Sequence, residues 1–107
     1  MLNQISIDID KINKGVWQSL HGSKFLIASI ESQAFKQAVL DCKDLTEDQL
    51  IQILAKTVLL DWVHVKNPSG DDIEYSQSMA VLALTQSDEV RGLVDYVSTT
   101  LRFYCEL

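Results

Sequence analysis

Hydrophobic and polar residues alternate at the start of the chain. Ile5, Ile7 and Ile9 are separated by polar residues, and a period of two predicts a short strand with the isoleucines on one face. The runs "GVWQSL" and "KFLIASI" follow, joined by a short polar break that contains Gly22. Two strand-like runs with such a break predict a β-hairpin that ends near Ser29. Residues 1–30 are therefore expected to form a β element.

From residue 31 onward the apolar residues recur at helical spacing. Ser32 can cap a first helix that carries Phe35 on its apolar side. Residues 46–49 read Thr-Glu-Asp-Gln, which is the pattern of a capping box, and the acids suit the positive end of a helix. The apolar positions from Leu50 to Trp62 continue this period, so we expect the second helix to end near Val63.

The segment "NPSGDD" then interrupts the pattern, because proline and glycine both disfavour a continuing helix. Ser76 can cap a further helix, and Ser87 or Asp88 can cap the closing one. The closing helix has the clearest helical spacing in the chain. Its apolar residues are Val90, Leu93, Val94, Val97, Leu101 and Tyr104.

These elements predict one α+β domain over residues 1–107, mainly α-helical, with a small N-terminal β-hairpin or sheet and a helical part over residues 31–107. Hydrophobic residues make up 47% of the chain, enough for one core at this length. Trp17 and Trp62 are expected to anchor that core.

The net charge is −6, and an acidic surface repels nucleic-acid phosphates and anionic lipids. We therefore expect neither nucleic acid nor membrane as a partner. The opening residues do not resemble a secretory signal. Cys42 and Cys105 are accordingly expected to be reduced thiols in a cytoplasm.

The chemistry-bearing residues show no spacing that is typical of a site. His21 and His64 lack the patterns of metal ligands. The acids after Gly70 do not follow the calcium-loop order, and the glycines are too scattered for a phosphate loop. We expect no catalytic residue, no metal site and no cofactor. A cysteine and a histidine brought together by the fold would be the enzymatic alternative.

The segment from residue 46 to 101 resembles the tail assembly chaperones of long-tailed, siphovirus-type bacteriophages. The shared order is an acid-Trp pair, a turn with glycine, a Tyr-Ser pair, an apolar helix, an acidic break and a closing helix. Here the motif residues are Asp61, Trp62, Gly70, Tyr75 and Ser76. We expect all five to be structural, with the Tyr75 hydroxyl finding a partner at the turn.

The resemblance implies a non-enzymatic protein that binds and solubilises the tape measure protein while the tail tube assembles. It also implies the tail tube protein as a further partner, self-association, and a place in the bacterial host cytoplasm rather than in the mature virion. The net negative charge is compatible with this role, because it favours solubility. A virion structural protein for tail completion or head–tail joining is the main alternative. An acidic decoy that mimics DNA is another, although the acids are dispersed along the chain.

A chaperone of this kind has to present apolar surface to an amphipathic helix. The closing helix is the candidate surface, because it carries apolar residues beyond its main stripe. The predicted partner-binding residues are Val90, Leu93, Val97, Leu101, Phe103 and Tyr104. Each of them could equally complete the core.

Overall fold

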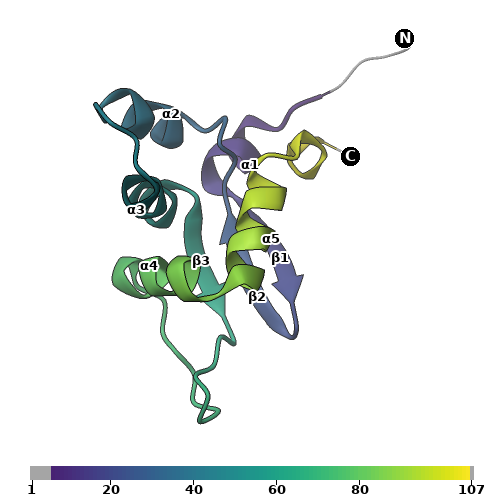
Figure 1. Cartoon of the computed structure of the whole chain (residues 1–107). Coiled ribbons are helices and arrows are strands. Elements are labelled where there is room, and N and C mark those ends of the chain that lie inside the picture. The colour runs from purple at the N-terminus through teal and green to yellow at the C-terminus, as the bar shows by residue number, and fades with distance from the viewer. Residues whose placement is uncertain (1–5, 107) are drawn as a thin grey trace.

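The protein folds around a three-stranded antiparallel sheet flanked by short helices, as a computed structural model shows (Figure 1). The structure describes residues 6–106. The predicted α+β class is confirmed. The elements are α1 (Ile9–Lys14), β1 (Val16–Leu20), β2 (Ser23–Ile27), α2 (Gln33–Leu40), α3 (Glu47–Thr57), β3 (Leu59–Val63), α4 (Gln77–Gln86), α5 (Asp88–Ser98) and the 3-10 helix η1 (Leu101–Tyr104).

The predicted hairpin is present as β1 and β2, which pair from Val16↔Ile27 to Leu20↔Ser23. Its turn is His21-Gly22, with φ values of 49° and 84°. Two consecutive positive φ values match the right-handed twist of the flanking strands. The expectation for Trp17 is wrong: its side chain is 47% exposed, because alternation along β1 places it on the sheet face that points away from the core.

The predicted long helix ends early, and this is a correction. α3 stops at Thr57, and residues 59–63 form β3, which pairs antiparallel with β2. Trp62 is therefore a strand residue opposite Phe25, and both side chains are buried. The pairing partner lies more than thirty positions earlier in the chain, so local spacing gave no sign of it.

The N-terminal strand prediction is also corrected. Ile5 lies outside the described residues, and Ile7 forms only an isolated bridge with Cys105. Ile9 opens α1, because the Asp8 side chain accepts a hydrogen bond from the Lys11 backbone N–H at 3.2 Å and caps a helix there. This helix buries Ile12 in the core.

The predicted helix starts are confirmed where a side chain caps them. Ser32 Oγ accepts from Phe35 N at 3.2 Å, and Ser76 and Ser87 cap α4 and α5 in the same way. Thr46 and Gln49 form the full capping box, with both reciprocal hydrogen bonds present. These caps satisfy backbone donors that a helix start leaves free.

The closing helix is shorter than predicted. α5 ends at Ser98, and the hydroxyl groups of Thr99 and Thr100 bond back to carbonyls of Asp95 and Tyr96. The chain then turns into η1, so Leu101 and Tyr104 do not belong to α5. Tyr104 folds back into the core, where its hydroxyl donates to the Ile27 carbonyl at 3.0 Å.

One buried cluster connects the N-terminal β element with the helical part. It contains residues of α1, β2, α3, β3, α4, α5 and η1, among them Ile12, Ile27, Leu54, Val94 and Tyr104. The first and last described segments lie side by side, since Asp8 N donates to Tyr104 O at 2.8 Å. The helical and sheet segments therefore share one core.

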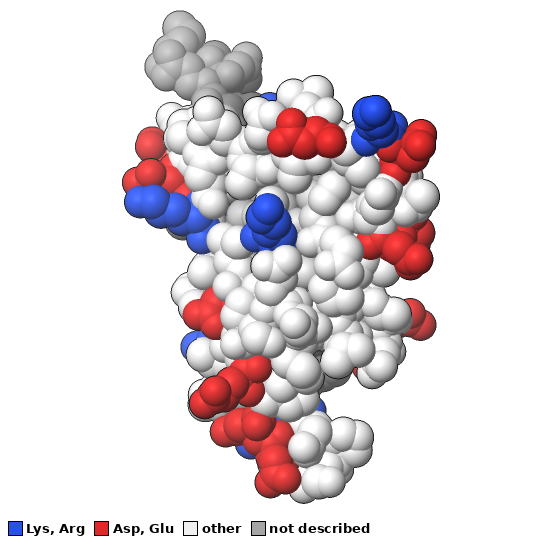
Figure 2. Space-filling view, turned by 90° about the vertical axis from the view of Figure 1, so that its left-hand side faces the viewer, with Lys and Arg blue, Asp and Glu red and all other residues white. Residues whose placement is uncertain are grey.

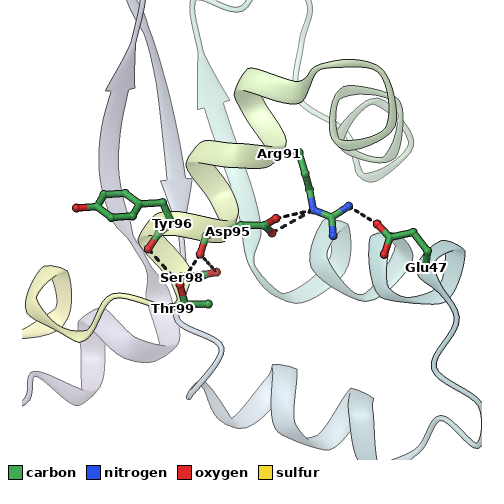
Figure 3. A network of polar contacts seen from close by, with 6 residues as sticks. All are labelled: Glu47, Arg91, Asp95, Tyr96, Ser98 and Thr99. Carbon is green, nitrogen blue, oxygen red and sulfur yellow. Dashed lines mark hydrogen bonds and ion pairs between the residues drawn. The ribbon is translucent and has the colours of Figure 1, made fainter.

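A polar network on the surface links α5 to α3 (Figure 3). The Arg91 guanidinium contacts Glu47 at 2.6 Å and Asp95 at 3.0 Å. Both carboxylates raise the pKa of Arg91 against the opposing effect of desolvation, which is the largest single contribution. Arg91 thus contacts one carboxylate on α3 and one on its own helix, so we regard the network as a clamp between two helices.

Candidate functional site

Two residues of the Trp–turn–Tyr-Ser motif, Trp62 and Tyr75, pack together, whereas Gly70 and Ser76 are exposed. The Trp62 indole lies edge-on to Phe25 at 6.2 Å and to Tyr75 at 5.2 Å between ring centroids. Its Nε1 donates to the Ile73 carbonyl at 2.8 Å, which ties the loop after β3 to the strand. Asp61 accepts from the Trp62 backbone N–H. The geometry gives these residues a packing role.

The Tyr75 hydroxyl joins this unit to α3 and not to the turn, where we expected its partner. It donates to Leu59 O at 2.6 Å and lies 3.3 Å from Ala55 O, so it bridges the end of α3 and the start of β3. Burial raises the pKa of Tyr75, and the nearby Asp61 carboxylate raises it further. A neutral phenol is thus the stable form at this position.

The turn between β3 and α4 is held by its own polar groups. Asn67 Oδ1 accepts from the backbone N–H groups of Ser69 and Asp71, both at 3.0 Å, and Gly70 takes the positive φ of 88° that the turn requires. Lys66 contacts Asp72 at 2.7 Å and lowers the pKa of that carboxyl group. This loop extends away from the sheet at the lower end of Figure 1.

The predicted partner-binding residues separate into two groups. Val90, Val97 and Tyr104 are buried in the core, as the alternative interpretation allowed. Leu93 and Phe103 are half-buried, and Leu101 is 46% exposed. Of the six residues, Leu101 therefore has the most exposed side chain.

Leu101 lines an open groove of about 440 Å³ between the two ends of the chain. The residues that share it come from α1, the segment after β2 and the α5–η1 junction. We call it the terminal groove; its apolar lining is Ile7, Ile9, Ile12, Ile30 and Leu101. Ile9 is 63% exposed at its rim. Lys36 and Glu31 also line it and form an ion pair at 3.0 Å.

An aromatic patch next to η1 was not anticipated from the sequence. Tyr96 and Phe103 meet edge-to-face at 5.6 Å, and the Arg102 guanidinium lies over both rings at 5.8 and 5.1 Å. Arg102 also donates to the Tyr96 hydroxyl. Tyr96 sits on the polar side of α5 and is half-exposed. The turn into η1 brings it to Phe103, and helical spacing alone does not show this.

The two histidines line one open depression at the hairpin turn, and neither cysteine lies there. His21 Nε2 is 2.7 Å from Glu89 Oε2, and His64 has a positive φ after β3. Cys42 Sγ contacts Gln49 Oε1, and Cys105 Sγ contacts Leu101 O. Within residues 6–106, no group of three or more His, Cys, Asp or Glu side chains is placed to hold a metal ion. None of the helices described is long and apolar enough to span a bilayer.

Comparison with known proteins identifies one family. A family model described as "YdaY prophage protein" matches residues 22–102, which include every strand and helix from β2 to α5. Neither the curated protein sequences nor the solved structures compared contain a match. This match confirms the expectation of a bacteriophage protein at the level of a prophage protein. The description of the family does not mention tail assembly. The chain belongs to the YdaY prophage protein family.

Proposed function

We propose that this prophage protein is a non-enzymatic tail assembly chaperone that binds the tape measure protein and keeps it soluble in the host cytoplasm. The tail tube protein would be a second partner, and copies of the chain would associate with one another. The observation that carries the proposal is the terminal groove. It presents exposed apolar side chains on a protein that is otherwise strongly acidic.

The groove suits one side of an amphipathic helix. Ile9 and Leu101 project at its rim, while Ile12 forms part of its buried floor. Apolar anchors from a helix at positions i, i+3 and i+4 enter grooves of this kind. The net negative charge of the whole chain would keep a complex with an apolar partner in solution. The resemblance over residues 46–101 supplies the identity of the partner.

Co-expression with the tape measure protein of the same prophage tests the proposal. We expect the partner to be soluble and to co-purify when this chain is present, and to aggregate when it is absent. Leu101→Glu should reduce co-purification at least about tenfold, because a charge would enter the apolar contact. Val97→Glu is not a suitable variant, because Val97 is buried and the charge would disrupt the core.

Leu40→Glu is the matched control. Leu40 is 78% exposed on α2 and lies outside the terminal groove, so this variant makes the same chemical change elsewhere. If both variants reduce co-purification equally, the terminal groove is not the binding surface. If the partner stays insoluble with the unchanged protein, the chaperone role is wrong. Detection of this chain in purified particles would then indicate a structural part of the virion.

A further inference from the structure

A second groove, of about 460 Å³, lies between the turn of the β-hairpin, the loop after β3 and the corner between α4 and α5. We call it the hairpin groove. Half-buried apolar side chains form its walls, and Leu82, which is 45% exposed, stands at its edge. The lining residues used below are Leu20, Val65, Ile73, Met79, Leu82 and Glu89. Of the predicted partner-binding residues, the buried Val90 also lines this groove.

The floor of the hairpin groove is rigid. Buried Phe25 and Trp62 lie beneath it, and Trp62 is fixed by its hydrogen bond to Ile73 and by its edge contacts with two rings. Met79 in the wall is an adaptable side chain that can adjust to different apolar groups. A fixed aromatic floor with an adaptable wall lowers the cost of ordering the site when a ligand binds.

Carboxylates outnumber basic side chains in the chain segments around the rim. The segments that border the groove carry Asp71, Asp72, Glu74, Asp88 and Glu89. Among the lining residues of this groove, Glu89 is the one carboxylate and lies 2.7 Å from His21 Nε2, and Lys66 is the one lysine or arginine and is paired with Asp72 at 2.7 Å. Figure 2 shows acidic side chains gathered at the end of the molecule where Figure 1 places this loop. The rim therefore favours a cationic ligand.

Leu82 extends the apolar surface beyond the groove. It also lines a shallow depression between α3 and α4, together with Val81. The face formed by α2, α3 and α4 is largely uncharged near α4 in Figure 2. A groove that continues along α4 through Leu82 and Val81 fits a segment of helix better than it fits a small molecule.

We propose that the hairpin groove binds a basic amphipathic helix of a partner protein. Leucine-like side chains of the helix enter the groove over Trp62 and Met79, and its lysines or arginines contact the acidic rim. The inference goes beyond the proposed function, because it concerns a different surface and does not require the partner to be the tape measure protein.

The test uses a synthetic peptide with leucine and lysine at helical spacing, added to the full-length protein in a nuclear magnetic resonance titration. We expect backbone shifts to change at residues that line the hairpin groove, and the affinity to fall as salt is raised. A peptide with glutamate in place of each lysine should bind at least about tenfold more weakly, because the rim repels it.

Two variants locate the site, each with a matched control. Leu82→Glu should weaken binding of the leucine–lysine peptide about tenfold, whereas Leu40→Glu adds the same charge outside the groove and should change it less than about twofold. Glu89→Lys should weaken binding at least about fivefold. Asp44→Lys makes the same change in net charge on the α2–α3 connection and controls for it. Circular dichroism confirms that each variant is folded.

Equal effects of Leu82→Glu and Leu40→Glu would overturn the proposal, because they would mean non-specific attraction to an acidic protein. Equal binding of both peptides would overturn the claim of a basic partner. Failure of the tape measure co-expression with success of this titration would reject the proposed function and leave the hairpin groove as a binding site. Success of the co-expression with failure of this titration would reject the hairpin groove as a binding site and leave the proposed function in place.

Discussion

At the residue scale, Trp62 and Tyr75 each make specific hydrogen bonds and ring contacts, although their motif carries no catalytic group. The indole N–H and the phenol O–H each satisfy a backbone carbonyl, and the two rings meet edge-on at an angle of 81°. Aromatic pairs in this geometry contribute beyond the area they bury. The motif therefore fixes the loop after β3 against α3 and, with it, the floor of the hairpin groove.

Replacement of Tyr75 by phenylalanine tests this role. The ring would remain, but the carbonyls of Leu59 and Ala55 would lose a donor. We expect the free energy of unfolding to fall by about 1 kcal/mol, as for a typical hydrogen bond of this kind. Urea denaturation measures it.

Tyr96→Phe is the control, because Tyr96 is half-exposed and its hydroxyl contacts only the exposed Arg102 among the described residues. Its effect should stay within about 0.5 kcal/mol, the usual range for a surface position. A loss of stability in Tyr96→Phe as large as that in Tyr75→Phe would contradict the special role of Tyr75.

The residues of the candidate site were only partly predictable from the sequence. Leu101 was expected to be available to a partner, and it is exposed. Val97 and Tyr104 share its helical spacing but are buried. Val97 lies on the core-facing side of α5, and Tyr104 turns toward Ile27 after the chain leaves the helix at Thr99. Periodicity identifies which residues are apolar on one face, but it cannot state where the helix stops. The hairpin groove was missed because it is assembled from three separate segments.

At the scale of elements, caps were the most reliable signal. Ser32, Thr46, Ser76 and Ser87 all begin helices where a hydroxyl group was expected to accept a backbone N–H. A cap is a local interaction within three or four residues, so the sequence contains it completely. The same argument explains α1, where Asp8 provides a cap that the isoleucine alternation obscured.

The missed strand β3 is the opposite case. Val58, Leu59 and Trp62 are buried, and their positions fit a helical period as well as the end of a helix followed by a strand. What decides between them is the pairing with β2, a contact between distant parts of the chain. In such segments, contacts with distant parts of the chain outweigh the local preference for helix or strand.

The capping box at α3 gives a prediction at this scale. Thr46→Ala would remove the acceptor for Gln49 N and should lower the free energy of unfolding by about 1 kcal/mol. Thr85→Ala is the control, since Thr85 lies exposed within α4, where alanine is the better helix former. That variant should be neutral or slightly stabilising. Equal losses in the two variants would show that the cap contributes nothing particular.

At the scale of the whole molecule, the first and last described segments of the chain hydrogen-bond to each other. Asp8 N donates to Tyr104 O, and Glu106 N donates to Ser6 O. Tyr104 extends from this junction into the centre of the core and hydrogen-bonds to β2. The terminal groove lies beside the same junction. The 3-10 helix η1 therefore contributes both to this junction, through Tyr104, and to the groove, through Leu101.

The buried Tyr104 also makes global stability sensitive to alkaline pH. Burial raises the pKa of this phenol above its ordinary value of 10.0. Below that value both the folded and the unfolded chain hold the proton, so the stabilisation is fully present. Above it the unfolded chain releases the proton while the folded chain retains it, and stability falls as pH rises, by at most about 1.4 kcal/mol per pH unit.

Urea unfolding between about pH 9 and about pH 11 measures this slope. Lysine side chains also titrate there, so the comparison is with Tyr104→Phe under the same conditions. That variant should start about 1 kcal/mol less stable, because it lacks the hydrogen bond to Ile27. Its stability should nevertheless fall less steeply with pH, because the phenol whose pKa differs between the folded and the unfolded chain is absent. Parallel curves for the two proteins would mean that Tyr104 ionises equally in both states, and that the core is open to solvent at η1.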